Sequence, residues 1–274
     1  MGYRLAGQSF AVAAASGLAS SVNLWNNDDG TPGVIDLVDD MFYVGPQYVT
    51  FGGTSGSAVG FHTLTMQGTA RLVGLTGTGR QGLVSLQCGE TIDGFCRMHT
   101  IAAGAFDDGG QANLSELSYE CVVAIETLST VGEEFTVEAG LVGNAPGYGA
   151  FFRYQRTVSA TKWLAVTENG GTESVKALDG TGGAGDGGTI AAYSFPDSGF
   201  FRLKVVISST DGTHNNSTAS FYVNGTLVWT STSNMPQHSL AGSVNIVKSA
   251  GTTSRAVALD YARLRYDFRL ARTP

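Results

Sequence analysis

Four carboxylates have a spacing that invites an acid and base interpretation: Glu120 with Glu126, and Glu134 with Glu138. Retaining glycosidases hold a general acid and a nucleophile about 5 Å apart, and β-sandwich members of this class carry them on one strand as E-x-D-x-x-E. No E-x-D-x-x-E occurs here, and the residues between Glu120 and Glu126 on the same strand face are Val122 and Ala124. Both pairs are too far apart along a strand to share one cleft. We expect solvated strand faces, no catalytic residue and a protein that is not an enzyme.

Other catalytic and ligand-binding patterns are also missing. The sequence has neither G-x-S-x-G nor H-E-x-x-H, and its histidines are scattered, without carboxylates or cysteines at ligand spacing: His62, His99, His214 and His238. Residues 77–82 match G-x-G-x-x-G literally, but the apolar run after them has the pattern of a strand. A pyrophosphate site needs a helix there, so a hairpin loop is expected. The sequence therefore predicts no metal and no cofactor.

The composition favours many short strands joined by tight turns. The chain has 274 residues with 38 glycines, 42% hydrophobic residues and only 14% charged residues. Its formal net charge of -7 argues against nucleic acid as the main partner, because phosphate binding requires a concentrated basic face. No apolar run approaches the length of a membrane span, so membrane insertion is not expected.

Three cysteines, Cys88, Cys96 and Cys121, form no metal-binding spacing and cannot all pair within the chain. An odd, sparse cysteine count suits folding in a reducing compartment. We expect all three to be buried free thiols.

Alternating apolar and polar residues predict an antiparallel β-fold. Residues 119–125 and 135–141 alternate with a period of two, and further short apolar runs follow at strand-like intervals. No helical stretch is long enough to connect parallel strands. The expected fold class is therefore an all-β antiparallel sandwich or barrel.

The clearest hairpin lies between residues 200 and 229. Asn224-Gly225 favours a type I′ turn, because both residues readily adopt positive φ. A two-residue turn there would pair Tyr222 with Leu227 and Phe221 with Val228, giving an apolar face around Phe221 and Val228.

Adjacent aromatic residues must point to opposite faces of a strand, so some of them lie outside the core. The doublets are Phe151-Phe152, Phe200-Phe201 and Phe221-Tyr222. The outward rings could cover a second layer, a subunit interface or a sugar, and the sequence does not choose between these. Tyr154 and Trp163 are the candidates for carbohydrate contact.

Residues 1–36 have no sustained period and are expected to form an extended N-terminal arm for attachment or subunit contact. They are rich in small residues, and Tyr3, Phe10 and Trp25 are spaced anchors suited to a partner's groove. Residues 37–268 form the expected sandwich domain, and residues 269–274 a short C-terminal tail.

The order of motifs resembles a phage virion protein module with a concanavalin A-like jelly-roll fold. The resemblance spans roughly residues 37–268 and is carried by segments including SLQCGETIDGFCRMHT, FFRYQ and KWLAVTENGGTES, and most specifically by FYVNGTLVW and RAVALDYARLRYDF. It implies a jelly roll with the arm as its attachment segment. Such modules occur in tail fibres, head fibres and capsid decorations.

The leading hypothesis is accordingly a non-enzymatic virion structural protein displayed on a phage capsid or tail. The resemblance implies other virion proteins as partners, self-association with a trimer favoured, and a role in adhesion to a host-surface glycan. Assembly in the reducing bacterial cytoplasm fits the free thiols. The alternatives are a lectin-like carbohydrate-binding module and, further behind, a jelly-roll glycoside hydrolase.

Overall fold

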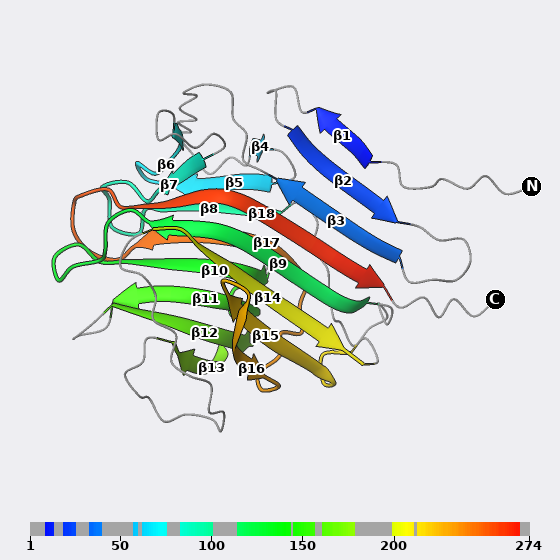
Figure 1. Ribbon diagram of the computed structural model, residues 1–274. Helices are drawn as coiled ribbons and strands as arrows, with labels where there is room; N and C mark the ends of the chain where they lie inside the picture. The colour runs from blue at the N-terminus through cyan, green and yellow to red at the C-terminus, as the bar shows by residue number, and fades with distance from the viewer. Residues whose placement is uncertain are drawn as a thin grey trace, which may run out of the picture.

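A computed structural model of the chain shows two antiparallel β-sheets packed face to face (Figure 1). It describes residues 9–13, 19–25, 33–39, 57–59, 62–75, 83–100, 114–143, 145–156, 161–178, 199–210 and 213–268. All regular elements in these ranges are strands, which confirms the predicted all-β jelly-roll sandwich. The described part of the chain contains no helix that is long and apolar enough to cross a membrane.

The larger sheet has the strand order β1-β2-β3-β18-β9-β14-β15-β16, and β7 also pairs with β18 and carries β6. Its strands are β1 (Ser9–Ala13), β2 (Ala19–Trp25), β3 (Gly33–Asp39), β6 (Arg71–Leu75), β7 (Leu83–Gln87), β9 (Leu114–Ile125), β14 (Phe201–Ser209), β15 (Ser217–Val223), β16 (Thr226–Ser231) and β18 (Ala256–Phe268).

The smaller sheet has the order β13-β12-β11-β10-β17-β8-β5-β4. Its strands are β4 (Ser57–Val59), β5 (His62–Gln67), β8 (Phe95–Thr100), β10 (Phe135–Gly143), β11 (Gly149–Arg156), β12 (Thr161–Asn169), β13 (Thr172–Ala177) and β17 (Leu240–Lys248). The long strands β10 and β17 are neighbours at its centre, so their outward side chains stand in the middle of the outer face.

Aromatic side chains join the two sheets across the core. Phe152 of the smaller sheet meets Phe221 of the larger one edge to face, with ring centroids 5.4 Å apart. Trp163 and Phe201 form a second such pair at 5.1 Å. Edge-to-face pairs add specific attraction to the burial of a large apolar area. These contacts fix how the smaller sheet sits on the larger one.

Gly242 of β17 lets the sheets approach closely at one point. A Cβ atom at this position would lie 2.1 Å from Cδ2 of Tyr119, which no real side chain tolerates. The ring of Tyr119, on β9 of the other sheet, occupies this space and is 1% exposed. Position 242 therefore requires glycine for packing. The contact with Tyr119 fixes the distance between β17 and the larger sheet at this point.

The predicted hairpin is present, with one error in its register. Asn224 and Gly225 have φ values of 50° and 84°, and Tyr222 pairs with Leu227 as expected. Phe221, however, pairs with Trp229 and not with Val228, because a β-bulge shifts the register between Phe221 and Tyr222. A bulge places an extra residue on one strand, so Val228 and Trp229 are both buried beside Phe221.

The segment predicted as an arm contributes strands to the larger sheet. β1 pairs with β2, β2 with β3, and β3 with β18, so β3 lies beside the last strand of the chain and β2 and β1 extend the sheet beyond it (Figure 1). β3 crosses the predicted boundary at residue 36. Its Asp36 accepts two hydrogen bonds from Arg263, including Nε to Oδ1 at 2.7 Å. The division into arm, sandwich and tail stays a prediction.

Candidate functional site on the outer face of the smaller sheet

Two strands distant in sequence bring four polar side chains together on the outer face of the smaller sheet. On β8, Cys96 and Met98 point into the core, so Arg97 and His99 point away from it. On β17, Val244 and Ile246 point inward and leave Ser243 and Asn245 outside. In the pairing of β8 with β17, Arg97 lies opposite Asn245 and His99 lies opposite Ser243.

A cavity of about 220 Å³ opens beside these side chains. It is lined by residues of β8, β10 and β17, namely Arg97, His99, Val142, Gly143, Ala241 and Ser243. We refer to this cavity, together with Asn245, as the β8–β17 site.

The β8–β17 site contains polar atoms that are buried without a hydrogen bond. Ser243 and Asn245 are 1% and 3% exposed. Within the described part of the chain, Oγ of Ser243, Oδ1 of Asn245 and Nε of Arg97 have no hydrogen-bond partner. An unsatisfied buried polar group costs about 1–3 kcal/mol, and most buried groups in folded proteins avoid this cost. Two of these atoms belong to residues that line the cavity, and the third belongs to Asn245, the cross-strand partner of Arg97. Together they mark a place where a ligand can supply missing partners.

The neighbouring arginine on the same face is satisfied. Arg153 of β11 donates from Nε to Oε1 of Glu138 at 3.0 Å and from Nη1 to Oε1 of Glu173 at 2.8 Å. Its guanidinium also lies 5.1 Å from the centroid of the Phe151 ring. Burial alone lowers the pKa of Arg153, but Glu138 and Glu173 outweigh it, so the pKa lies above its ordinary value. This arginine is a fixed part of the sheet surface.

A small apolar cluster lies on the same outer face. Phe151, Leu164 and Val166 are buried together, with Val142 and Ala177 packed against them. Phe151 is the outward member of a predicted aromatic doublet, and Phe152 lies in the main core as the alternation requires. Val142 belongs to both the cluster and the cavity wall, so the β8–β17 site has an apolar side as well as a polar one.

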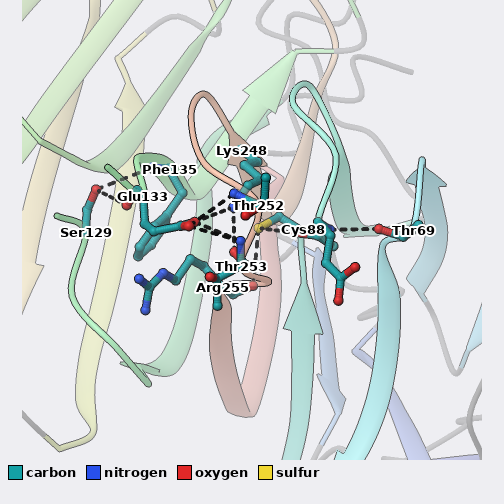
Figure 2. Close-up of polar contacts among 11 residues, drawn as sticks. Thr69, Cys88, Ser129, Glu133, Phe135, Lys248, Thr252, Thr253 and Arg255 are labelled. Atoms are coloured by element: carbon teal, nitrogen blue, oxygen red, sulfur yellow. Dashed lines mark hydrogen bonds and ion pairs between the residues drawn. The ribbon is translucent and has the colours of Figure 1, made fainter. Parts of the chain in front are cut away.

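A polar network at the end of β17 has a different character (Figure 2). Lys248 donates from Nζ to Oε2 of Glu133 at 2.9 Å and also to the carbonyl of Thr253. Glu133 in turn accepts the backbone N–H groups of Thr252 and Thr253. Both carboxylate oxygens of Glu133 accept hydrogen bonds from the protein. This network therefore stabilises the turn after β17 and leaves Glu133 no oxygen for a ligand.

The three cysteines are buried and free, as predicted. Burial raises the pKa of Cys96 to about 12, and it also raises the pKa values of Cys88 and Cys121. Because the thiolate is the nucleophilic form, these thiols are not poised for chemistry.

The structure corrects the two candidates for carbohydrate contact. Tyr154 and Trp163 are 2% and 5% exposed and belong to the main core. Tyr154 accepts the backbone N–H of Ser129 at its hydroxyl, with a distance of 2.9 Å. A sugar stacks only on an accessible ring face, so neither residue can serve as its platform in this fold.

The three proposed attachment residues are only partly covered by the structure. Phe10 lies in β1 and Trp25 in β2, and Tyr3 lies outside the described residues. Their role in attachment stays a prediction.

The carboxylates considered first for catalysis lie off the core and interact with other residues. Glu126 accepts a hydrogen bond from Oγ of Ser85 at 2.6 Å, and Glu120 lies 3.7 Å from Arg202. Glu134 and Glu138 pair with Arg156 and Arg153, respectively.

The sequence correctly predicted that these carboxylates lie on the surface, but it did not predict the β8–β17 site. Alternation on β8 and β17 is visible in the sequence, but their pairing is not.

Comparison with known proteins gives distant structural similarities. No protein-family model and no curated protein sequence matches the chain. Among solved structures, one of alginate lyase Aly36B is similar with a TM-score of 0.47 and 11% identity, covering 80% of this chain and 98% of that one. The Emp46p carbohydrate recognition domain gives a TM-score of 0.46 at 7% identity, with 74% and 87% covered. The binding domain of botulinum neurotoxin DC gives 0.43 at 9% identity, with 79% and 44% covered.

These similarities correct the prediction that the chain is not an enzyme. The prediction rested on the missing E-x-D-x-x-E pair, which excludes one kind of glycosidase site. The missing pair does not bear on other kinds of enzyme site, and the solved structures similar to this chain include those of an alginate lyase.

Proposed function

We propose that this protein binds carbohydrate at the β8–β17 site. The observation that carries the proposal is a set of three buried polar atoms without hydrogen-bond partners among the described residues: two on Arg97 and Ser243, which line the cavity, and one on Asn245, the cross-strand partner of Arg97. This function was the alternative in the sequence analysis. It replaces the purely structural role as the preferred one, because a structural surface has no need for unsatisfied groups at a cavity.

The chemistry of the site matches that of a sugar. A sugar hydroxyl both donates and accepts, so it can donate to Oδ1 of Asn245 and accept from Nε of Arg97, while Oγ of Ser243 can do either. Val142 and Ala241 supply apolar contacts for the C–H faces of a ring. Ligand pockets for larger molecules usually measure about 300–1,000 Å³. A cavity of about 220 Å³ therefore suits one sugar unit of a glycan.

The proposed setting is the surface of a phage particle. Residues 1–36 would attach the protein to other virion proteins, a trimer would present several binding faces, and assembly would take place in the bacterial cytoplasm. This part rests on the sequence resemblance, and the three free thiols support it. A glycan of the host surface is the ligand that such a position would expose to the β8–β17 site.

The test is a Ser243→Ala variant titrated with a panel of neutral and acidic oligosaccharides by calorimetry. Removing a hydroxyl that lacks a partner relieves a cost in the free protein, so the variant should melt at a higher temperature. The same change removes a ligand contact worth about 0.5–1.5 kcal/mol, so affinity should fall roughly two- to tenfold.

Ser118→Ala is the matched control, because Ser118 is a buried strand serine on the outer face of the other sheet. This variant should leave glycan affinity unchanged. Equal affinity of wild type and Ser243→Ala for every glycan that binds would contradict the proposed site, and an absence of glycan binding by the wild type would contradict the function itself.

A further inference from the structure

The charges around the β8–β17 site point to a more specific ligand. Building on the proposed carbohydrate function, we propose that the sugar bound there carries a carboxylate, as uronic and sialic acids do, and that Arg97 is the residue that recognises it.

Arg97 differs from most described arginines in having no ion pair with a described residue. Five other described arginines have a carboxylate within ion-pair distance: Arg153, Arg156, Arg202, Arg263 and Arg265. No ion pair joins Arg97 to any described residue, although the chain carries an excess of acidic groups and a net charge of -7. A cation beside a cavity without a counterion attracts an anionic group from outside.

The described groups around Arg97 do not supply a free negative charge. The described residues that line the cavity include no carboxylate, and the cross-strand partner of Arg97 is the neutral Asn245. The next residue along this row, opposite Asn245 on β10, is Glu138. Its carboxylate is held by Arg153 at 3.0 Å. The acidic group nearest in the row is therefore already neutralised by a different arginine.

The guanidinium edge of Arg97 corresponds to the edge with which another arginine of this protein binds a carboxylate. Arg263 shows how an arginine in this protein grips a carboxylate: it uses Nε together with Nη2 on the two oxygens of Asp36. On Arg97 the Nε donor of that same edge is buried without a partner among the described residues. A planar guanidinium edge fits the two oxygens of a carboxylate, whereas a neutral hydroxyl can use only one of its donors.

The neutral groups beside Arg97 fit the rest of such a sugar. Oδ1 of Asn245 accepts from a ring hydroxyl, and Oγ of Ser243 bonds to a second one. The site would thus read one charged and two neutral features of a single sugar unit.

The experiment compares trigalacturonic acid with its methyl ester, and 3′-sialyllactose with lactose, by calorimetry at low and high salt. The proposal expects the acid of at least one pair to bind at least tenfold more tightly than its neutral counterpart, with a difference that shrinks as salt screens the charge. Preference for the galacturonate or for the sialylated sugar identifies the source of the carboxylate.

Two variants test the role of Arg97. Arg97→Gln should reduce affinity for the acidic sugar about ten- to a hundredfold, and affinity for its neutral counterpart only about two- to tenfold, the loss expected from one neutral hydrogen bond. Asn245→Asp keeps the arginine but gives it an internal carboxylate, so it should also abolish the preference for acidic sugars. Arg202→Gln, on the other sheet and half exposed, is the control and should change neither affinity.

The outcomes separate the two proposals. Equal binding of acidic and neutral sugars, or a preference that survives in both Arg97→Gln and Asn245→Asp, overturns the carboxylate inference and leaves carbohydrate binding standing. Failure of the wild type to bind any of the four probes or any member of the neutral and acidic oligosaccharide panel overturns both.

Discussion

Lys248 and Glu133 form an ion pair whose two partners are unequally buried. Nζ of Lys248 lies 2.9 Å from Oε2 of Glu133, and the lysine side chain is 0% exposed whereas the glutamate side chain is 18% exposed. Glu133 also accepts backbone N–H groups of Thr252 and Thr253. The charge of Lys248 therefore needs its partner for compensation far more than the charge of Glu133 does.

Glu133→Gln should destabilise the protein more than Lys248→Met does. The first change leaves an ammonium group fully buried without its counterion, whereas the second leaves a partly exposed carboxylate with its two backbone donors. The double variant should be about as stable as Lys248→Met, because it no longer contains a buried ammonium group without a counterion. Urea unfolding of all four proteins measures this order. Equal losses in the two single variants would show that burial of the lysine does not decide the energetics.

The acid limb of the stability curve should contain a contribution from Glu133. The hydrogen bond from Lys248, helped by the Thr253 and Thr252 N–H groups and opposed by burial, lowers the pKa of Glu133 from 4.5 to about 2. Because the pKa is lower in the folded state, ionised Glu133 stabilises that state fully above pH 4.5. This stabilisation is lost as the pH falls towards 2. Carboxyl-carbon NMR should give a midpoint near 2 in the wild type and a higher one in Lys248→Met. A wild-type midpoint near 4.5 would refute the network.

Phe221→Ala should lower the free energy of unfolding by about 3–5 kcal/mol, because Phe221 is completely buried and contacts Phe152 across the sheets. Tyr222→Ala is the control on the opposite face of the same strand, where the side chain is only partly buried, and its cost should be clearly smaller. Chemical denaturation compares the two. A similar cost for both would mean that the inter-sheet contact contributes little beyond local strand packing.

Replacing Asn224-Gly225 by Val-Val should impair folding. Both positions have positive φ, which β-branched residues resist, and the turn sets the pairing of Tyr222 with Leu227. The yield of soluble protein and the cooperativity of melting report the effect. Melting like that of the wild type would show that the neighbouring strands, and not the turn, fix the hairpin.

Two N-terminal deletions should behave differently. Removal of residues 1–32 leaves β3 paired with β18 and keeps the bond between Asp36 and Arg263, so cooperative melting should persist while joining to the particle or oligomer is lost. Removal of residues 1–39 also takes β3 from β18 and should lower the melting temperature further. Calorimetry and sedimentation distinguish these results. Normal assembly after the shorter deletion would place the attachment surface on the sandwich itself.

Most of the fold was predictable because strand alternation is a local property. The apolar face of residues 135–141, the aromatic doublets and the Asn224-Gly225 turn all follow from neighbours within a few residues. The bulge beside Phe221 was not predictable, since it depends on how Val228 and Trp229 share one space in the core.

The candidate site was out of reach of the same reasoning. Arg97 and Asn245 come together only because β8 and β17 pair, and nothing in either strand specifies that partner. Tyr154 and Trp163 were chosen for their chemistry, but their side chains alternate into the core. A sequence pattern gives the face on which a residue lies within its own strand, and the assembled sheets decide whether that face meets solvent, a ligand or the core.

The position of β18 has a consequence for how the protein is made. This strand pairs with β3, β7 and β9, and the bond between Asp36 and Arg263 spans 227 residues. A ribosome releases β3 and β9 long before it synthesises their common neighbour, so the larger sheet cannot close during most of translation. Folding that waits for distant pairing is slow and leaves strand edges open. Newly made chains should therefore depend on chaperones until β18 has emerged.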